Sequence, residues 1–192
     1  MTARGRRPTD GPGEDEGRLY ARALRLLAAR ERSEADLRRA LARYGEGSAV
    51  ERVLERLRAS RYVDDGRFAA AFTQSRALER GAGARWVRAA LAAHGVAGDV
   101  AAREAARAGE AEAETARRLA RRALAAMADV PAAVRARRLA GQLTRRGYRP
   151  GVVYEVVREA LRGQESAEAA EVLDALARAE DGDGEEEPGP LP

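Results

Sequence analysis

A glycine-ended helical segment occurs three times in this chain at nearly constant spacing. The glycines are Gly45, Gly95 and Gly147, which lie 50 and 52 residues apart. A fixed period near 50 residues is the signature of tandem repeats, whose units must support one another because none buries enough apolar surface alone. Apolar residues keep register with each glycine, four and eight positions before it and five after it: Leu41, Leu91 and Leu143; Leu37, Val87 and Leu139; Val50, Val100 and Val152.

Each repeat has the pattern of three short helices. In the first repeat, apolar residues step by three and four positions in three separate runs. Ser33, with Asp36 three residues later, predicts a capped start for the second helix. Gly45 is a plausible left-handed residue after its end. We therefore expect an all-α fold of three tandem three-helix repeats, over residues 18–63, 64–109 and 110–163.

The two ends of the chain differ from this repeated region. Residues 1–17 are rich in glycine, proline and charge, which predicts a disordered leader. Residues 164–192 form an acidic tail, which is expected to be disordered at its end. A helix is possible over 166–180, with a stripe of Ala170, Leu173, Leu176 and Ala177.

The joint between the first two repeats is the segment Arg61-Tyr62-Val63-Asp64-Asp65-Gly66-Arg67-Phe68-Ala69. Asp64 or Asp65 can act as the N-cap of the next helix, because a carboxylate there accepts free backbone N–H groups and complements the helix dipole. Tyr62 and Val63 then precede the cap and are expected to pack forward onto Phe68. We interpret the two aspartates as caps rather than as an acid–base pair or a metal site.

Several classes of chemistry find no support in the sequence. There is no cysteine, which excludes disulfides and thiol catalysis, and all 35 basic residues are arginine, which excludes a Walker lysine or a Schiff base. Gly81-Ala82-Gly83 predicts a helix break rather than a dinucleotide fingerprint, and the sole histidine, His94, lies in a helix end without metal-ligand partners. We expect no enzyme activity, no cofactor and no metal. No apolar run is long enough to span a bilayer and no signal peptide is recognisable, so we expect a cytoplasmic protein.

Charge is strongly segregated along the chain. The tail 164–192 carries −9 and residues 1–17 carry −1 of the total +4, which leaves +14 on residues 18–163. Guanidinium groups bind phosphates through paired hydrogen bonds, so the basic region predicts a polyanionic or acidic partner, although arginine can also simply solubilise helix faces. Aromatic residues are scarce, which favours backbone contact or a charged protein groove over base reading. The candidate binding residues are Arg38, Arg39, Arg43, Arg85, Arg88, Arg117, Arg118, Arg121, Arg122, Arg135, Arg138, Arg145 and Arg146.

The chain resembles the RecX family, the bacterial regulators of the RecA recombinase. The resemblance covers about residues 18–163, and the joint carries its most specific part, Tyr62-Val63-Asp64-Asp65-Gly66-Arg67-Phe68-Ala69. The acidic tail lies outside it, and the basic set made only of arginine and the weak apolar stripe from Ala101 to Ala108 depart from the family pattern. Further matches are Ser33-Glu34-Ala35-Asp36-Leu37-Arg38 with Leu41 and Gly45, Arg80-Gly81, Arg85, Leu91 and Gly95-Val96.

The resemblance implies a function in DNA repair, recombination and the SOS response. The expected partner is the RecA filament on single-stranded DNA, in whose groove an elongated, curved array of repeats would bind as a monomer. Binding would suppress ATP hydrolysis, strand exchange and coprotease activity. A RecA-independent, sequence-nonspecific nucleic-acid-binding repeat protein is the alternative, and a protein-interaction scaffold is a third. The acidic tail could fold back on the arginine face and compete with DNA, or serve only to solubilise the chain.

Overall fold

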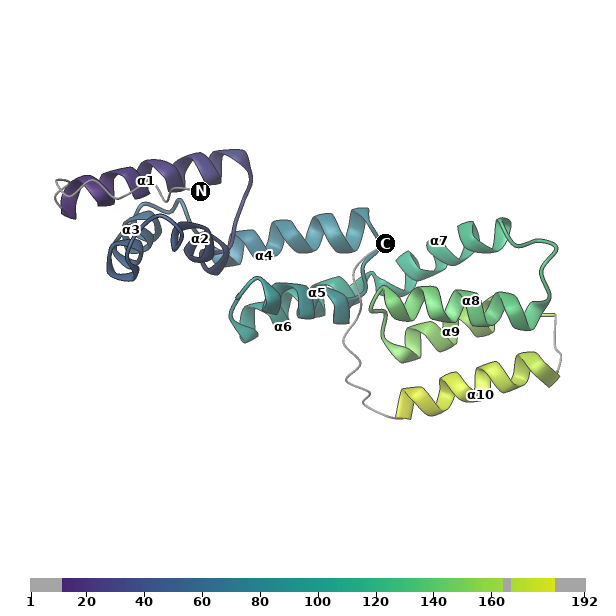
Figure 1. Cartoon of the computed structure of the whole chain (residues 1–192). Helices are drawn as coiled ribbons and strands as arrows, with labels where there is room; N and C mark the ends of the chain where they lie inside the picture. Colours follow the sequence, from purple (N-terminus) through teal and green to yellow (C-terminus); the bar gives the residue numbers. More distant parts are fainter. Residues whose placement is uncertain (1–11, 164–166, 182–192) are drawn as a thin grey trace, which may run out of the picture. The chain divides into compact units, whose positions relative to one another are not determined.

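The computed structural model describes residues 12–163 and 167–181, and over these residues every regular element is helical (Figure 1). The chain forms two compact units. Unit 1 covers the chain up to Phe68 together with His94–Ala97, and unit 2 covers Ala69–Ala93 and the chain from Gly98 onward. The helices are α1 (Pro12–Ala29), α2 (Glu34–Leu41), α3 (Gly47–Ala59), α4 (Asp65–Thr73), the π-helix η1 (Gln74–Glu79), α5 (Ala84–Ala93), α6 (Gly98–Glu110), α7 (Glu112–Ala125), α8 (Ala132–Arg145), α9 (Pro150–Ala160) and α10 (Ala167–Asp181).

Unit 1 is built around the apolar stripes of α1, α2 and α3. Leu37 and Leu41 of α2, the leucines at fixed distances before Gly45, are fully buried. They pack with Leu19 and Ala23 of α1 in one core whose remaining buried members are Ala49, Val50, Val53, Leu54, Leu57 and Val63. The repeat pattern read from the sequence therefore marks the core of this unit.

The first helix begins earlier than the sequence analysis predicts. It starts at Pro12 rather than at Arg18, so residues 12–17 belong to α1 and not to a disordered leader. Proline is compatible with a first turn because its missing N–H has no partner there. Asp15 and Glu16 follow where negative charge is favoured, and Glu16 pairs with Arg52 of α3 at 2.9 Å. The rest of the predicted leader, 1–11, lies outside the described residues, as do 164–166 and 182–192.

The glycines that end the three second helices do not share one conformation. Gly95 and Gly147 both have φ of +76°, the left-handed region that favours glycine. Gly45 does not, which corrects the prediction of a left-handed residue there. Its constraint is packing, because a Cβ at Gly45 would overlap the side chain of Leu19.

The middle helices pack through small residues. Ala101, Ala105 and Ala108 of α6 are buried, and α6 packs against α5. The stripe that departs from the family pattern is thus a close-packed alanine face, which suits a short approach between helix axes. Phe72 stacks on the only tryptophan, Trp86, with ring planes 4° apart and centroids 6.0 Å apart.

The last four helices share one core. Leu139, Leu143 and Val157 are buried there among residues of α7, α8 and α9. Helix α10 lies along α8 and α9 (Figure 1) and contributes Ala169 and Val172 to that core. Of the predicted stripe, Leu173 and Leu176 pack against this core and Ala177 is partly buried, whereas Ala170 is exposed.

Candidate nucleic-acid interface

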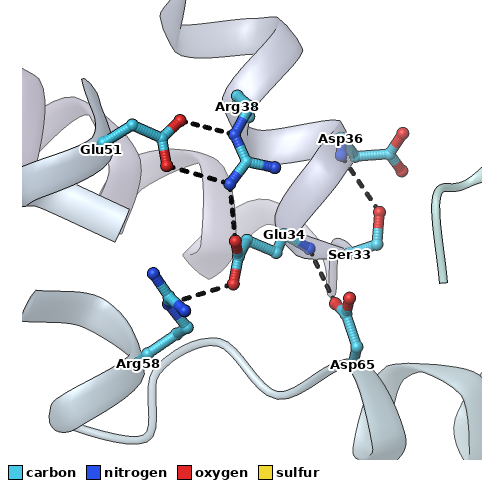
Figure 2. A network of polar contacts seen from close by, with 7 residues as sticks. All are labelled: Ser33, Glu34, Asp36, Arg38, Glu51, Arg58 and Asp65. Atoms are coloured by element: carbon cyan, nitrogen blue, oxygen red, sulfur yellow. Dashed lines mark hydrogen bonds and ion pairs between the residues drawn. The ribbon is translucent and has the colours of Figure 1, made fainter. Parts of the chain in front are cut away.

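The two aspartates of the first joint cap two different helices. Asp64 Oδ1 accepts the backbone N–H of Arg67 at 2.9 Å, so Asp64 caps its own helix, α4. Asp65 Oδ1 accepts the backbone N–H of Glu34 at 2.8 Å and so caps the start of α2 (Figure 2). Both carboxylates thus satisfy helix N–H groups that would otherwise lack a partner.

Ser33 joins the start of α2 to the end of the second glycine-ended helix. Its Oγ accepts the N–H of Asp36 at 3.1 Å and donates to the carbonyl oxygen of His94 at 2.6 Å. Gly95 is required here, because a Cβ on it would overlap the side chain of Ala35. The contact between Asp36 and His94 Nδ1 measures 2.8 Å. Burial by itself would raise the pKa of Asp36, but hydrogen bonds from Arg39 and His94 outweigh it and lower that pKa.

The aromatic residues of the joint have unequal roles. Phe68 is buried and forms a T-shaped contact with the His94 ring, with centroids 5.4 Å apart and ring planes at 71°. Val63 is buried in the core of unit 1. Tyr62, in contrast, is 51% exposed, so it is much less packed than its expected contact with Phe68 implies. The chain turns at Arg61, which has φ of +55°, and this turn leaves Tyr62 facing outward.

Two of the predicted binding arginines are held in local ion pairs. Arg38 contacts Glu51 at 2.6 Å and Glu34 at 2.7 Å, and Arg58 contacts the other oxygen of Glu34 at 3.2 Å (Figure 2). The hydrogen bond with Glu51 is the main cause that raises the pKa of Arg38. Arg39 contacts Asp36. These arginines therefore tie α2 to α3 and to its own first turn.

A second joint lies within unit 2, where residues 80–85 meet residues 146–148. As in the first joint, the start of one helix is bonded to the end of another, here mainly through backbone groups. Gly83 N–H donates to the carbonyl of Arg146 at 2.7 Å, and Arg85 N–H donates to that of Gly147 at 3.1 Å. The buried Tyr148 donates its hydroxyl to Gly81 O at 3.1 Å, and burial raises the pKa of Tyr148 to about 12. Arg146 donates to Arg80 O at 2.8 Å, so this predicted binding arginine holds the joint together.

Glu112, which the sequence analysis does not single out, is the central group of this second joint. Its side chain is 1% exposed. Oε1 accepts the N–H of Ala84 at 3.0 Å and that of Arg149 at 3.3 Å, and Oε2 accepts Arg149 Nε at 2.6 Å. One carboxylate thus caps α5 and α9 while it belongs to α7.

The two joints use an acidic residue at equivalent places. Asp65 is the first residue of α4 and caps α2, and Glu112 is the first residue of α7 and caps α5. In each case the first helix of one repeat supplies the cap for the second helix of the repeat before it. The repeat register does not reveal this equivalence, because the acid follows Glu34 by 31 residues but Ala84 by 28, and Glu112 therefore falls three positions short of the place that aligns with Asp65.

The other predicted arginines fall into two groups. Arg117 pairs with Glu159 at 3.0 Å and Arg121 with Glu114 at 3.2 Å, while Arg85 and Arg135 are half-buried. The remaining six are exposed and make no ion pair with any carboxylate in the part of the chain that the structure describes. We call them the exposed arginine set: Arg43, Arg88, Arg118, Arg122, Arg138 and Arg145.

The first two repeats of the chain match known family models. The family model for the first three-helix domain of RecX matches residues 20–57, and that for the second three-helix domain matches residues 64–103. The regulatory protein RecX of Thermobifida fusca is 43% identical over 153 residues, which cover 76% of this chain and 82% of that protein. The chain belongs to the RecX family. The regulatory protein RecX of Amycolatopsis mediterranei is 36% identical over 79% of this chain and 87% of its own length.

Solved RecX structures share the fold. The crystal structure of a regulatory protein RecX matches with a TM-score of 0.68 at 23% identity, over 77% of this chain and 73% of that one. RecX from Lactobacillus salivarius matches with a TM-score of 0.67 at 14% identity, over 77% of this chain and 97% of that one. The chain accordingly shares the all-helical fold of these structures, and its two matched segments correspond to three-helix domains.

In residues 12–163 and 167–181, no group of three or more acidic, histidine or cysteine side chains is placed to hold a metal ion. Among the helices of that same region, none has the length and apolar character needed to cross a membrane.

Proposed function

We propose that this protein regulates the RecA recombinase, mainly as an inhibitor. It would bind the filament that RecA forms on single-stranded DNA and suppress ATP hydrolysis, strand exchange and coprotease activity in the cytoplasm. The observation that carries this proposal is membership of a family of regulatory proteins, with both RecX domain models matched in order. The protein would act by binding, with no catalytic residue of its own.

The distribution of arginines supports a binding mechanism. The exposed arginine set supplies cations that are not committed to the fold, whereas Arg38 and Arg39 hold α2 in place and Arg146 holds the second joint. Several exposed guanidinium groups can each contact a phosphate or a carboxylate, and their contributions add along an extended polyanion. We propose that the three repeats 18–63, 64–109 and 110–163 each present such groups, in a monomeric protein.

The test is the DNA-dependent ATPase of RecA on single-stranded DNA, measured with increasing amounts of the full-length protein. We expect inhibition at one molecule per few RecA protomers. A variant in which Arg88, Arg118 and Arg122 are glutamine should inhibit less. The matched control replaces Arg25, Arg56 and Arg103 with glutamine. These three arginines are exposed and lie outside the candidate residues, so this variant should inhibit like the natural protein. Absence of inhibition by the natural protein at these ratios would remove the proposal.

The second candidate function is nucleic-acid binding without RecA. The charge of +14 on residues 18–163 favours it, because a basic surface binds phosphates without sequence preference. Equal and equally salt-sensitive affinity for bare DNA and for the RecA filament would select this function. A clear preference for the filament would select regulation of RecA.

A further inference from the structure

A basic pocket lies in unit 1 beside the end of α2, and it includes residues that sequence reasoning did not assign to binding. Its volume is about 410 Å³, within the range of small-ligand sites. Leu26 and Ala40 provide apolar surface, and the other groups are mainly cationic or aromatic. The complete lining is Arg22, Leu26, Asp36, Arg39, Ala40, Arg43 and Tyr44.

An exposed aromatic ring with a guanidinium on one face forms part of this pocket. The guanidinium carbon of Arg22 lies 3.3 Å from the centroid of the Tyr44 ring. Tyr44 is nevertheless 54% exposed, so the fold does not cover its ring completely. The Nε atom of Arg22 is buried and has no hydrogen-bond partner. The fold therefore holds the Arg22 guanidinium against the Tyr44 ring, while part of each side chain stays accessible to a ligand.

The charges in the pocket do not cancel. The only carboxylate in its lining is Asp36, which contacts both Arg39 and His94. Arg22 and Arg43 make no ion pair with any carboxylate among the described residues. Two positive charges thus remain uncompensated beside an exposed ring, a combination suited to an anionic ligand that carries a planar group.

We propose that this pocket is a subsite for single-stranded DNA, in which Arg22 and Arg43 hold a backbone phosphate and Tyr44 stacks on a base. A base in a duplex is already stacked, so an aromatic platform favours a single strand. The proposal rests on the proposed function, because it assigns residues to the DNA strand of the filament. The proposal also distinguishes the arginines that contact DNA from those that contact acidic groups of a protein partner.

The test measures binding of a fluorescein-labelled 20-nucleotide oligo(dT) to the full-length protein by anisotropy, without RecA and over a range of KCl concentrations. Arg43→Gln, at an exposed turn, and Arg22→Gln should each weaken binding about 3- to 10-fold and reduce the salt slope by about 0.7. Tyr44→Leu should weaken binding about 5- to 10-fold on the single strand and much less on a duplex of the same length, while Tyr44→Phe should recover most of the loss. Thermal unfolding of each variant would show that the fold is retained.

Arg56→Gln is the matched control. Arg56 is exposed, also lies over a tyrosine ring (4.2 Å from the Tyr20 centroid) and is not part of the pocket. A loss in the pocket variants without a comparable loss in Arg56→Gln supports the subsite. Equal losses in all arginine variants, or no loss in any, overturn it. Unchanged oligo(dT) binding together with weaker inhibition of the RecA ATPase would also overturn it, because the pocket would then contact protein while the proposed function still held.

Discussion

The carboxylate of Glu112 should contribute more to the stability of unit 2 than any surface ion pair of that unit. In Glu112→Ala, the N–H of Ala84 loses its cap, which costs about 1 kcal/mol. The charge-assisted bond at 2.6 Å to Arg149 Nε is also lost. Because the Arg149 side chain is 56% exposed and can be hydrated, we count about 1 kcal/mol for it rather than the full cost of a broken buried pair. The long bond to Arg149 N–H adds roughly 0.5 kcal/mol.

The expected destabilisation is therefore about 2–3 kcal/mol, and Glu112→Gln should lie between the natural protein and the alanine variant. Glutamine can still accept the N–H of Ala84 through its amide oxygen, but its NH₂ group would then face the donor of Arg149. Urea unfolding followed by the fluorescence of Trp86, which lies in unit 2, measures the change directly.

Glu114→Ala provides the control for this prediction. Glu114 lies on the same helix and pairs with Arg121, but both side chains are about two-thirds exposed, with relative areas of 65% and 66%. Such a pair contributes roughly 0–0.5 kcal/mol. If Glu112→Ala were no more destabilising than Glu114→Ala, the carboxylate would not hold the second joint and the proposed equivalence with Asp65 would be refuted.

Three further predictions concern unit 2. Gly147→Ala should destabilise it by roughly 2–4 kcal/mol, because φ is +76° and a Cβ would overlap the backbone of Trp86, whereas Gly98→Ala, at a site with no atom within 4 Å, should cost little; urea midpoints would show the difference. Since burial raises the pKa of Tyr148 to about 12, its contribution is complete below pH 10 and is lost as the pH rises through 12, and Tyr148→Phe should flatten this alkaline loss in thermal unfolding curves. Val172→Asp should expose the core to a charge and lower the unfolding midpoint of unit 2, while Asp174→Asn, on the exposed face of α10, should leave it within about 0.5 kcal/mol.

The sequence predicts the helices well because their information is local and repeated. Leu37, Leu41, Leu139 and Leu143 keep a 3.6-residue period and a fixed distance to a glycine, and all four are buried. The shared period also predicts the fold class, because a fixed spacing near 50 residues is typical of stacked repeats of one design. Where the sequence departs from the repeat, as in α10, the prediction is less complete, since Ala170 is exposed and the buried Ala169 and Val172 were not predicted.

The candidate interface was harder to predict, because composition counts arginines but not their partners. Arg38 and Arg146 look like binding residues in the sequence, yet Glu51 and the carbonyl of Arg80 engage them across 13 and 66 residues of chain. Arg22 lies on the first helix of its repeat and was not predicted to bind, because its contact with Tyr44 depends on how α1 crosses the end of α2. Tertiary contacts of this kind decide which cations remain available, and no periodicity encodes them.

The packing of α10 changes how the role of the acidic tail must be tested. Ala169 and Val172 belong to the core of unit 2, so removing residues 164–192 would disturb the fold as well as the charge. Glu168, Glu171 and Asp174 are exposed on the same helix, and neutralising them to glutamine or asparagine changes the charge alone. If acidic groups compete with DNA for the arginines, this variant should bind oligo(dT) more tightly at low salt, and the gain should vanish as screening increases. Unchanged affinity at low salt would leave α10 with a structural role and remove competition by its exposed face.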